Sequence, residues 1–223
     1  MSRNTVWDNQ KNKTYYDTVD LSIQTGYAVR GGLSDHCDLK QIQHLVESAN
    51  SILEVGAGYG RVLEYLIDTN YPGDITAIEL SDQFFQTLAK YQDHVKLLHG
   101  SVLDETVLGN AQYDLILWLW SGISDFTHEE QKKVIHILTR RLVVGGTLVV
   151  EVLAHDNVPL NAVTGTTQSY VIKANDATLY GYIPSPQEIV ECAQAHEDLK
   201  VTHHHYQTDA GRNREMHFIR RVS

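Results

Sequence analysis

Residues 52–66 read ILEVGAGYGRVLEYL, and this stretch decides the fold. Its first apolar residues suit a buried strand of a parallel sheet, and the apolar residues after the glycines recur at helical spacing. Gly56, Gly58 and Gly60 lie between them, where residues without side chains let a ligand approach backbone N–H groups and a helix N-terminus. A strand, a glycine turn and a helix in this order predict a site for a nucleotide-like ligand.

The glycine spacing differs from that of a dinucleotide-binding turn. That fingerprint is G-x-G-x-x-G/A, and its third small residue packs the helix on the strand beside a pyrophosphate. Here the third place is taken by Arg61, which disfavours tight pyrophosphate binding and makes an NAD-dependent oxidoreductase the least favoured function. Glu54, at the end of the strand, suits a cationic ligand better than a phosphate.

The acidic-x-Gly-x-Gly-x-Gly pattern that begins at Glu54 resembles motif I of the class I S-adenosylmethionine (SAM) dependent methyltransferases of the small-molecule type. In that family the turn passes under the methionyl and ribose parts of SAM, and the acidic residue helps to hold the amino-acid end. The alternative is a glycine turn in another kind of α/β domain. The resemblance implies contacts to SAM from these residues: Glu54, Gly56, Ala57, Gly58 and Gly60.

A second acidic residue, Glu79, ends the next expected strand and follows Gly56 by 23 residues. This is close to the spacing at which a carboxylate accepts the ribose hydroxyls in nucleotide-binding βαβ units. In the methyltransferase family the corresponding carboxylate has that role, so the resemblance implies that Glu79 and the adjoining Leu80 contact the cofactor. The alternative is an ordinary acid that caps a helix.

The turn after the third expected strand departs from the family pattern. In the family this turn holds adenine, and an Asp usually bonds the exocyclic amine. This chain has Ser101 at that place, so either Ser101 or Asp104 makes the contact, and Val102 suits one face of the ring.

Trp118 and Trp120 end the fourth expected strand, and strand alternation predicts that they point the same way. A sulfonium cation is attracted by aromatic faces, so we expect Trp118 to lie in the site, whereas the place of Trp120 is open. The alternative is that both are core tryptophans.

Residues 1–33 are polar with interspersed aromatic residues, and they predict either a lid over the site or an arm on the surface. Tyr27 and Arg30 lie where family members often bring such residues to the methionine carboxylate; a simple loop is the alternative. Residues 34–223 are the expected SAM-binding domain. Within it, residues 154–184 are an insert with a β-hairpin, and such inserts shape the acceptor pocket in the family.

The expected fold is an α/β, Rossmann-like, doubly wound sheet of seven strands in the order 3-2-1-4-5-7-6, with an antiparallel terminal hairpin. We also expect a helix at 35–49 capped by Ser34, and capping boxes at Thr127 and Ser185. The seven strands are expected at residues 51–55, 75–78, 95–99, 115–120, 148–153, 200–207 and 214–221.

Composition narrows the partners and the location. The formal net charge of −10 disfavours broad binding to nucleic acid or to an anionic membrane, and no apolar run is long enough to span a bilayer. The first residues carry no signal-peptide pattern. Cys37 and Cys192 are far apart in the sequence, which suggests reduced thiols in a cytoplasmic protein. The oligomeric state is left open.

Two histidine positions attract attention. On a strand, His203 and His205 share one face, but spacing supplies no third ligand, so we expect no metal site. His155 follows the fifth expected strand and is a weak candidate for a general base, with a loop histidine as the alternative.

Taken together, the motifs predict a SAM-dependent methyltransferase that moves a methyl group to an N or O atom of a small molecule by in-line displacement. A non-catalytic SAM-binding partner or sensor is the alternative. Neither the acceptor nor the need for a base follows from the sequence.

Overall fold

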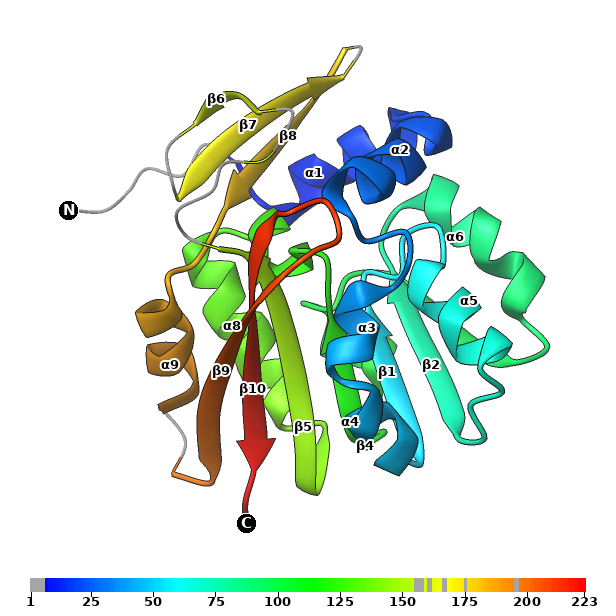
Figure 1. Ribbon diagram of the computed structural model, residues 1–223, viewed down its shortest axis with the longest axis vertical. Helices are drawn as coiled ribbons and strands as arrows, with labels where there is room; N and C mark the ends of the chain where they lie inside the picture. The colour runs from blue at the N-terminus through cyan, green and yellow to red at the C-terminus, as the bar shows by residue number, and fades with distance from the viewer. Residues whose placement is uncertain (1–6, 155–158, 160–161, 166–167, 175, 195–196) are drawn as a thin grey trace.

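The computed structural model describes residues 7–154, 159, 162–165, 168–174, 176–194 and 197–223. A seven-stranded sheet forms its centre, in the order β3-β2-β1-β4-β5-β10-β9 (Figure 1). Strands β1 to β5 are parallel to one another, and β10 is antiparallel to both β5 and β9. The seven strands are β1 (Ser51–Val55), β2 (Asp74–Glu79), β3 (Val95–His99), β4 (Tyr113–Trp118), β5 (Leu142–Leu153), β9 (Leu199–Gln207) and β10 (Asn213–Arg221).

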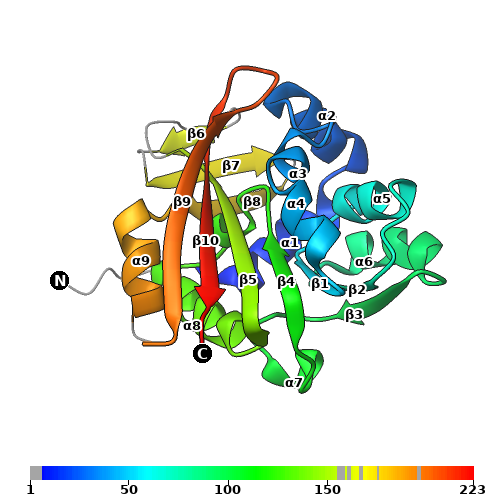
Figure 2. The same cartoon turned by 60° about the horizontal axis from the view of Figure 1, so that its bottom comes forward.

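This arrangement confirms the predicted fold. Numbered among themselves, the seven strands follow the order 3-2-1-4-5-7-6, and the terminal hairpin is antiparallel as expected. Figure 2 shows β9 at one end of the sheet, beside α9 (Pro186–Gln194), and β3 at the other end.

Helices cover both faces of the sheet because successive residues of its central strands point to opposite faces and are apolar on both. Ile52 packs in one apolar cluster with residues of α3 (Cys37–Gln41), α4 (Gln43–Ser48) and α5 (Arg61–Asp68). Leu53, the next residue along β1, packs in a second cluster with α8 (His128–Thr139) and α9. The remaining short helices are α6 (Asp82–Leu88), η1 (Ala89–Tyr91), α7 (Glu105–Leu108) and η2 (Gly122–Asp125).

Helix ends follow the predicted capping patterns at two places. Thr127 and Glu130 form a capping box at the start of α8, where each side chain accepts a hydrogen bond from the other's backbone N–H. Ser185 and Glu188 make the same reciprocal bonds at the start of α9. Each cap satisfies N–H groups that a helix leaves unpaired, which stabilises it by about 1 kcal/mol.

The prediction of one helix over 35–49 capped by Ser34 was wrong. The chain forms α3 and α4 with a break at Ile42, and His36, which precedes α3, has a φ of 56°. A tertiary interaction accounts for the start: the Arg61 guanidinium pairs with Asp38 and donates to the Leu33 carbonyl. This buried pair fixes the chain around residues 33–38 in a turn that a helix beginning at residue 35 does not allow.

A separate layer lies over the carboxyl ends of the parallel strands (Figure 1). It consists of α1 (Asn9–Thr18), α2 (Leu21–Gly31) and a small antiparallel sheet of β6 (Ala162–Gly165), β7 (Ser169–Ala174) and β8 (Ala177–Tyr182). Strands β7 and β8 are the hairpin expected in the insert. A third apolar cluster joins Tyr15 of α1, Phe84 of α6 and Tyr170 of β7.

Asn12 ties this layer together. Its side chain is fully buried and donates to the carbonyls of Asp125 (2.9 Å) and Tyr180 (2.8 Å), and it accepts from the N–H of Tyr180 (3.0 Å). Three segments of the chain are thus held by one amide. Among the described residues, no helix is long and apolar enough to cross a membrane.

We expect Asn12→Ala to lower the free energy of unfolding by about 2–3 kcal/mol, because the N–H and carbonyl of Tyr180 lose their partner and the Asp125 carbonyl keeps only Asn9 as a donor. Urea unfolding measures the change. Gln10→Ala, at an exposed position of the same helix, is the matched control and should stay within about 0.5 kcal/mol of the native protein. Equal effects of the two substitutions would contradict the role assigned to Asn12.

Candidate functional site

A cavity of about 270 Å³ lies between the sheet and the layer above it. Its floor comes from the turns after β1, β2, β3 and β4, and its roof comes from α1, α2, β7 and β8. This is the carboxyl edge of the parallel strands, where open α/β sheets bind their ligands. Of the predicted site residues, those lining the cavity are Tyr27, Gly56, Gly58, Glu79, Leu80, Ser101, Val102 and Trp118.

The glycine turn contributes bare backbone to the cavity. Gly56 and Gly58 have φ values of 72° and 56°, and a Cβ added to either one would meet no atom within 4 Å. Gly60 differs, because a Cβ there would come within 3 Å of the Tyr91 ring. Gly56 and Gly58 therefore leave room for a ligand, whereas Gly60 lets α5 pack against η1.

Glu79, the last residue of β2, lines the cavity and is 7% exposed. One carboxylate oxygen accepts from the N–H of Gly58 and the other from the N–H of Ser81, both at 2.7 Å. Burial raises the pKa of Glu79, and these backbone hydrogen bonds act in the opposite direction. The carboxylate is thereby fixed on the cavity wall, between the turns that follow β1 and β2.

Glu54 is buried but does not line the cavity. Its Oε2 has no hydrogen-bond partner among the described residues. Burial raises the pKa of Glu54 to about 8; the positive charge of Arg61 opposes this shift, and the carboxylates of Glu79 and Asp38 add to it. Its predicted contact with the amino-acid end of a cofactor stays a prediction.

Three further predicted residues also lie outside the lining: Ala57, Gly60 and Arg30. The Ala57 side chain packs in the core. Arg30 is exposed, with its guanidinium 4.9 Å from the centre of the Tyr27 ring, so only Tyr27 of that pair reaches the cavity.

The structure favours Ser101 over Asp104 at the third turn. Ser101 lines the cavity, and its Oγ accepts from the Leu103 N–H. Asp104 is exposed and caps α7 through the N–H of Thr106. A side chain engaged in a cap outside the cavity is poorly placed to contact a ligand inside it.

The two tryptophans do not point the same way, so that prediction was wrong. Trp118 is buried and packs edge-to-face on Phe126, whereas Trp120 packs near Tyr59 and Arg61 in the other apolar cluster. The reason is that β4 ends at Trp118, and Trp120 lies beyond it with a φ of 51°. Strand alternation therefore no longer holds there, although both rings border the cavity.

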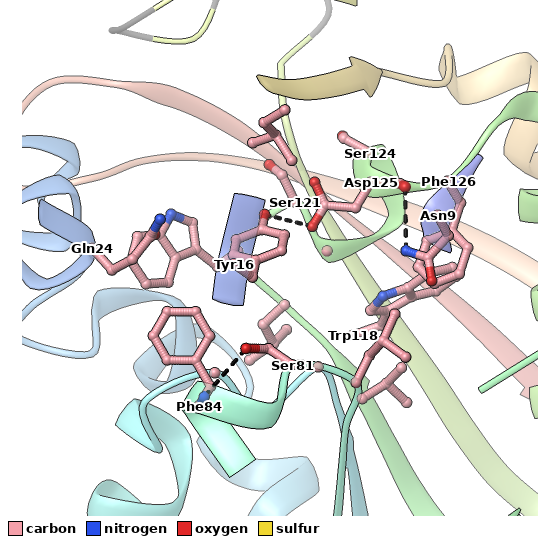
Figure 3. A pocket seen from close by; sticks show the side chains of 18 of the residues that line it. Asn9, Tyr16, Gln24, Ser81, Phe84, Trp118, Ser121, Ser124, Asp125 and Phe126 are labelled. Atoms are coloured by element: carbon pink, nitrogen blue, oxygen red, sulfur yellow. Dashed lines mark hydrogen bonds between the residues drawn. The ribbon is translucent and has the colours of Figure 1, made fainter. Parts of the chain in front are cut away.

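Several polar lining residues were not selected from the sequence. Asp125 of η2 accepts a hydrogen bond from the Tyr16 hydroxyl of α1 (2.7 Å), and Figure 3 shows the two side chains facing each other. Arg214 of β10 pairs with the buried Glu151 and donates to Ser121 Oγ at 2.8 Å. The sequence offered one signal, an acidic residue shortly after the fourth strand, but nothing in it indicated the partners.

Other predicted features lie outside this site. His155 is outside the described residues. His203, His204 and His205 are exposed on β9, and no group of three metal-binding side chains occurs in the part of the chain that the structure describes. Cys37 and Cys192 are free thiols.

The sequence was compared with models of known protein families. Residues 52–146 match the family model of a methyltransferase domain. No curated protein matched the chain.

Among solved structures, the chain is similar to the CcbJ methyltransferase from Streptomyces caelestis (TM-score 0.65, 17% identity, covering 86% of this chain and 97% of that one). It is also similar to SAM-bound CalS10 from Micromonospora echinaspora, an amino pentose methyltransferase (TM-score 0.65, 16% identity, covering 90% of this chain and 97% of that one). A third similar structure is that of the plantazolicin methyltransferase BamL, solved with S-adenosylhomocysteine (SAH) (TM-score 0.69, 12% identity, covering 96% of each chain). At these identities the likeness concerns the fold.

Because burial raises the pKa of Glu54, the free energy of unfolding should depend on pH. The folded-state pKa of Glu54, about 8, lies above the ordinary value of 4.5, so the folded state holds a proton that the unfolded state releases. The free energy of unfolding should therefore fall, relative to Glu54→Gln, as the pH rises from about 5 to 8. Urea unfolding across this range measures it. Glu64→Gln, exposed on α5, is the control and should keep the native pH dependence.

Proposed function

We propose that this protein, whose residues 52–146 match the family model of a methyltransferase domain, transfers the methyl group of SAM to an N or O atom of a small molecule by in-line displacement. The observation that carries the proposal is the Glu79 carboxylate. It is fixed by Gly58 and Ser81 on the wall of a cavity whose floor is a glycine turn.

The residues present fit SAM. The space above Gly56 and Gly58 is open to a ligand, and an added Cβ there would have no neighbour. The Glu79 carboxylate accepts from backbone N–H groups, and because a carboxylate has about four acceptor positions, it can still accept a hydrogen bond from a ribose hydroxyl. Ser101 and Val102 line the cavity beside it, where we assign them to the adenine edge and face.

Bound SAM supplies a sulfonium methyl group with a good leaving group. What the protein adds is alignment and the exclusion of water. The backbone of Gly56 and Gly58 and the carboxylate of Glu79 hold the donor from below. Trp118 and Tyr27 present aromatic surface to the cavity, and aromatic faces attract a cation.

A small-molecule acceptor suits the roof of the cavity. It is enclosed by α1, α2 and the insert, and most of its lining is apolar or aromatic. CalS10 and BamL, which share the fold, are described as acting on an amino pentose and on plantazolicin. The net charge of −10 speaks against a nucleic-acid acceptor, and the two free cysteines fit a cytoplasmic location.

Isothermal titration calorimetry with SAM and with SAH tests the donor site. Both should bind, and Glu79→Ala should weaken binding by about tenfold or more, because a charge-assisted hydrogen bond contributes about 1.5–3 kcal/mol. Glu64→Ala, exposed on α5, should bind as the native protein does. If neither compound binds the native protein, the proposal fails. Binding without transfer to any amine, phenol or carboxylate would favour a non-catalytic SAM-binding protein.

A further inference from the structure

Asp125 lines the cavity and has been assigned no role so far. It ends η2, shortly after β4, at the edge of the sheet where reacting atoms are expected. Its Oδ2 accepts from the Tyr16 hydroxyl, and among the described residues its Oδ1 has no hydrogen-bond partner (Figure 3). One carboxylate oxygen is therefore free to meet a ligand.

Asp125 differs from the other charged residues around the cavity in its partners. Glu79 and Asp125 are the acidic side chains among the described lining residues. The described lining also holds three cationic residues, Lys13, Arg212 and Arg214. Lys13 pairs with Asp17 and Asp82, and Arg214 pairs with Glu151. No cation in the described part of the chain forms an ion pair with Asp125.

Neutral aromatic groups surround Asp125 from separate elements. Tyr15 and Tyr16 of α1 and Tyr170 of β7 all line the cavity, and burial raises the pKa of each, so they stay protonated. Burial also raises the pKa of Asp125 to about 7; the carboxylate of Glu79 adds to the shift, and the Tyr16 hydrogen bond opposes it. On β5, which packs against η2, the charge of Glu151 is met by Arg214.

A carboxylate among aromatic rings suits an amine and repels an acid. Amines donate hydrogen bonds to a carboxylate, and their cationic form is attracted by aromatic faces. A carboxylate acceptor would instead meet the negative charge of Asp125. Arg214 offers it little compensation, because its guanidinium already makes two bonds to Glu151.

We propose that Asp125, positioned by Tyr16, binds an amine acceptor and takes the proton that methylation releases; this rests on the proposed function. The uncharged amine nitrogen uses its lone pair to form a bond to the methyl carbon while the carbon–sulfur bond breaks, and that bond's electron pair goes to sulfur, giving SAH. The nitrogen then carries one proton too many, and it passes this proton to the Asp125 carboxylate. From there the proton leaves to solvent.

Asp125→Asn tests the role of the carboxylate, since the amide has the same shape but cannot take the proton. The probes are benzylamine, phenethylamine and aniline, with benzyl alcohol and phenol as hydroxyl counterparts, and transfer is followed as SAH formed. We expect transfer to amines to fall about 100-fold or more, as for loss of a general base. SAM affinity, measured by calorimetry, should stay within about threefold of native, and far-UV circular dichroism checks folding. Asp93→Asn, exposed beyond η1, should behave as native.

The outcomes separate the two proposals. If the native protein does not bind SAM, the proposed function fails. If it binds SAM but methylates no amine of the panel, or methylates only the hydroxyl compounds, the inference about Asp125 is wrong. Near-native amine methylation by Asp125→Asn would also overturn it.

The pH profile tests the positioning role of Tyr16. With aniline, which is uncharged over the range used, the rate at saturating SAM should rise with pH around a midpoint near 7, as Asp125 loses its proton. Tyr16→Phe removes the hydrogen bond that favours the carboxylate, so the midpoint should move to higher pH. A loss of rate without a shift of the midpoint would mean that Tyr16 has a structural role only.

Discussion

The hydrogen bonds from the N–H groups of Gly58 and Ser81 to the Glu79 carboxylate are the interaction on which the site depends. They join the turn after β1 to the turn after β2, so the glycine backbone and the acidic group keep a fixed relation. Adjacent parallel strands bring these turns to the same edge, and the carboxylate then sets their separation. A cavity with a rigid floor follows from this one contact.

Two buried ion pairs fix the segments around that floor. Arg61 of α5 holds Asp38 and the Leu33 carbonyl, and this anchors the chain that leads from α2 into the core. Arg214 of β10 holds Glu151 of β5 and reaches Ser121, which anchors the chain after β4. Buried pairs gain little net stability after desolvation. Their contribution is to give both segments one position.

The core of the fold and the place of the glycine turn at the cavity could be predicted from the sequence because the signals there are local. The glycine spacing, the distance from Gly56 to Glu79 and the alternation in β1 are all readable along a short stretch. The predictions that failed depended on distant contacts. The late start of α3 accompanies contacts of Arg61 with Leu33 and Asp38, and the end of β4 at Trp118 removed the alternation expected for Trp120. Asp125 and Tyr16 are 109 residues apart, and no sequence period links them.

The layer above the cavity comes from two stretches of chain, α1–α2 before the sheet begins and β6–β8 inserted after β5, whereas the floor belongs to the sheet itself. Asn12 joins the two stretches to each other and to η2, without any bond to the glycine turn. Substitutions in the roof can thus change the shape of the upper cavity while the contact between the glycine turn and Glu79 is kept. Related sequences can therefore differ in the residues of the roof before they differ in the residues of the floor.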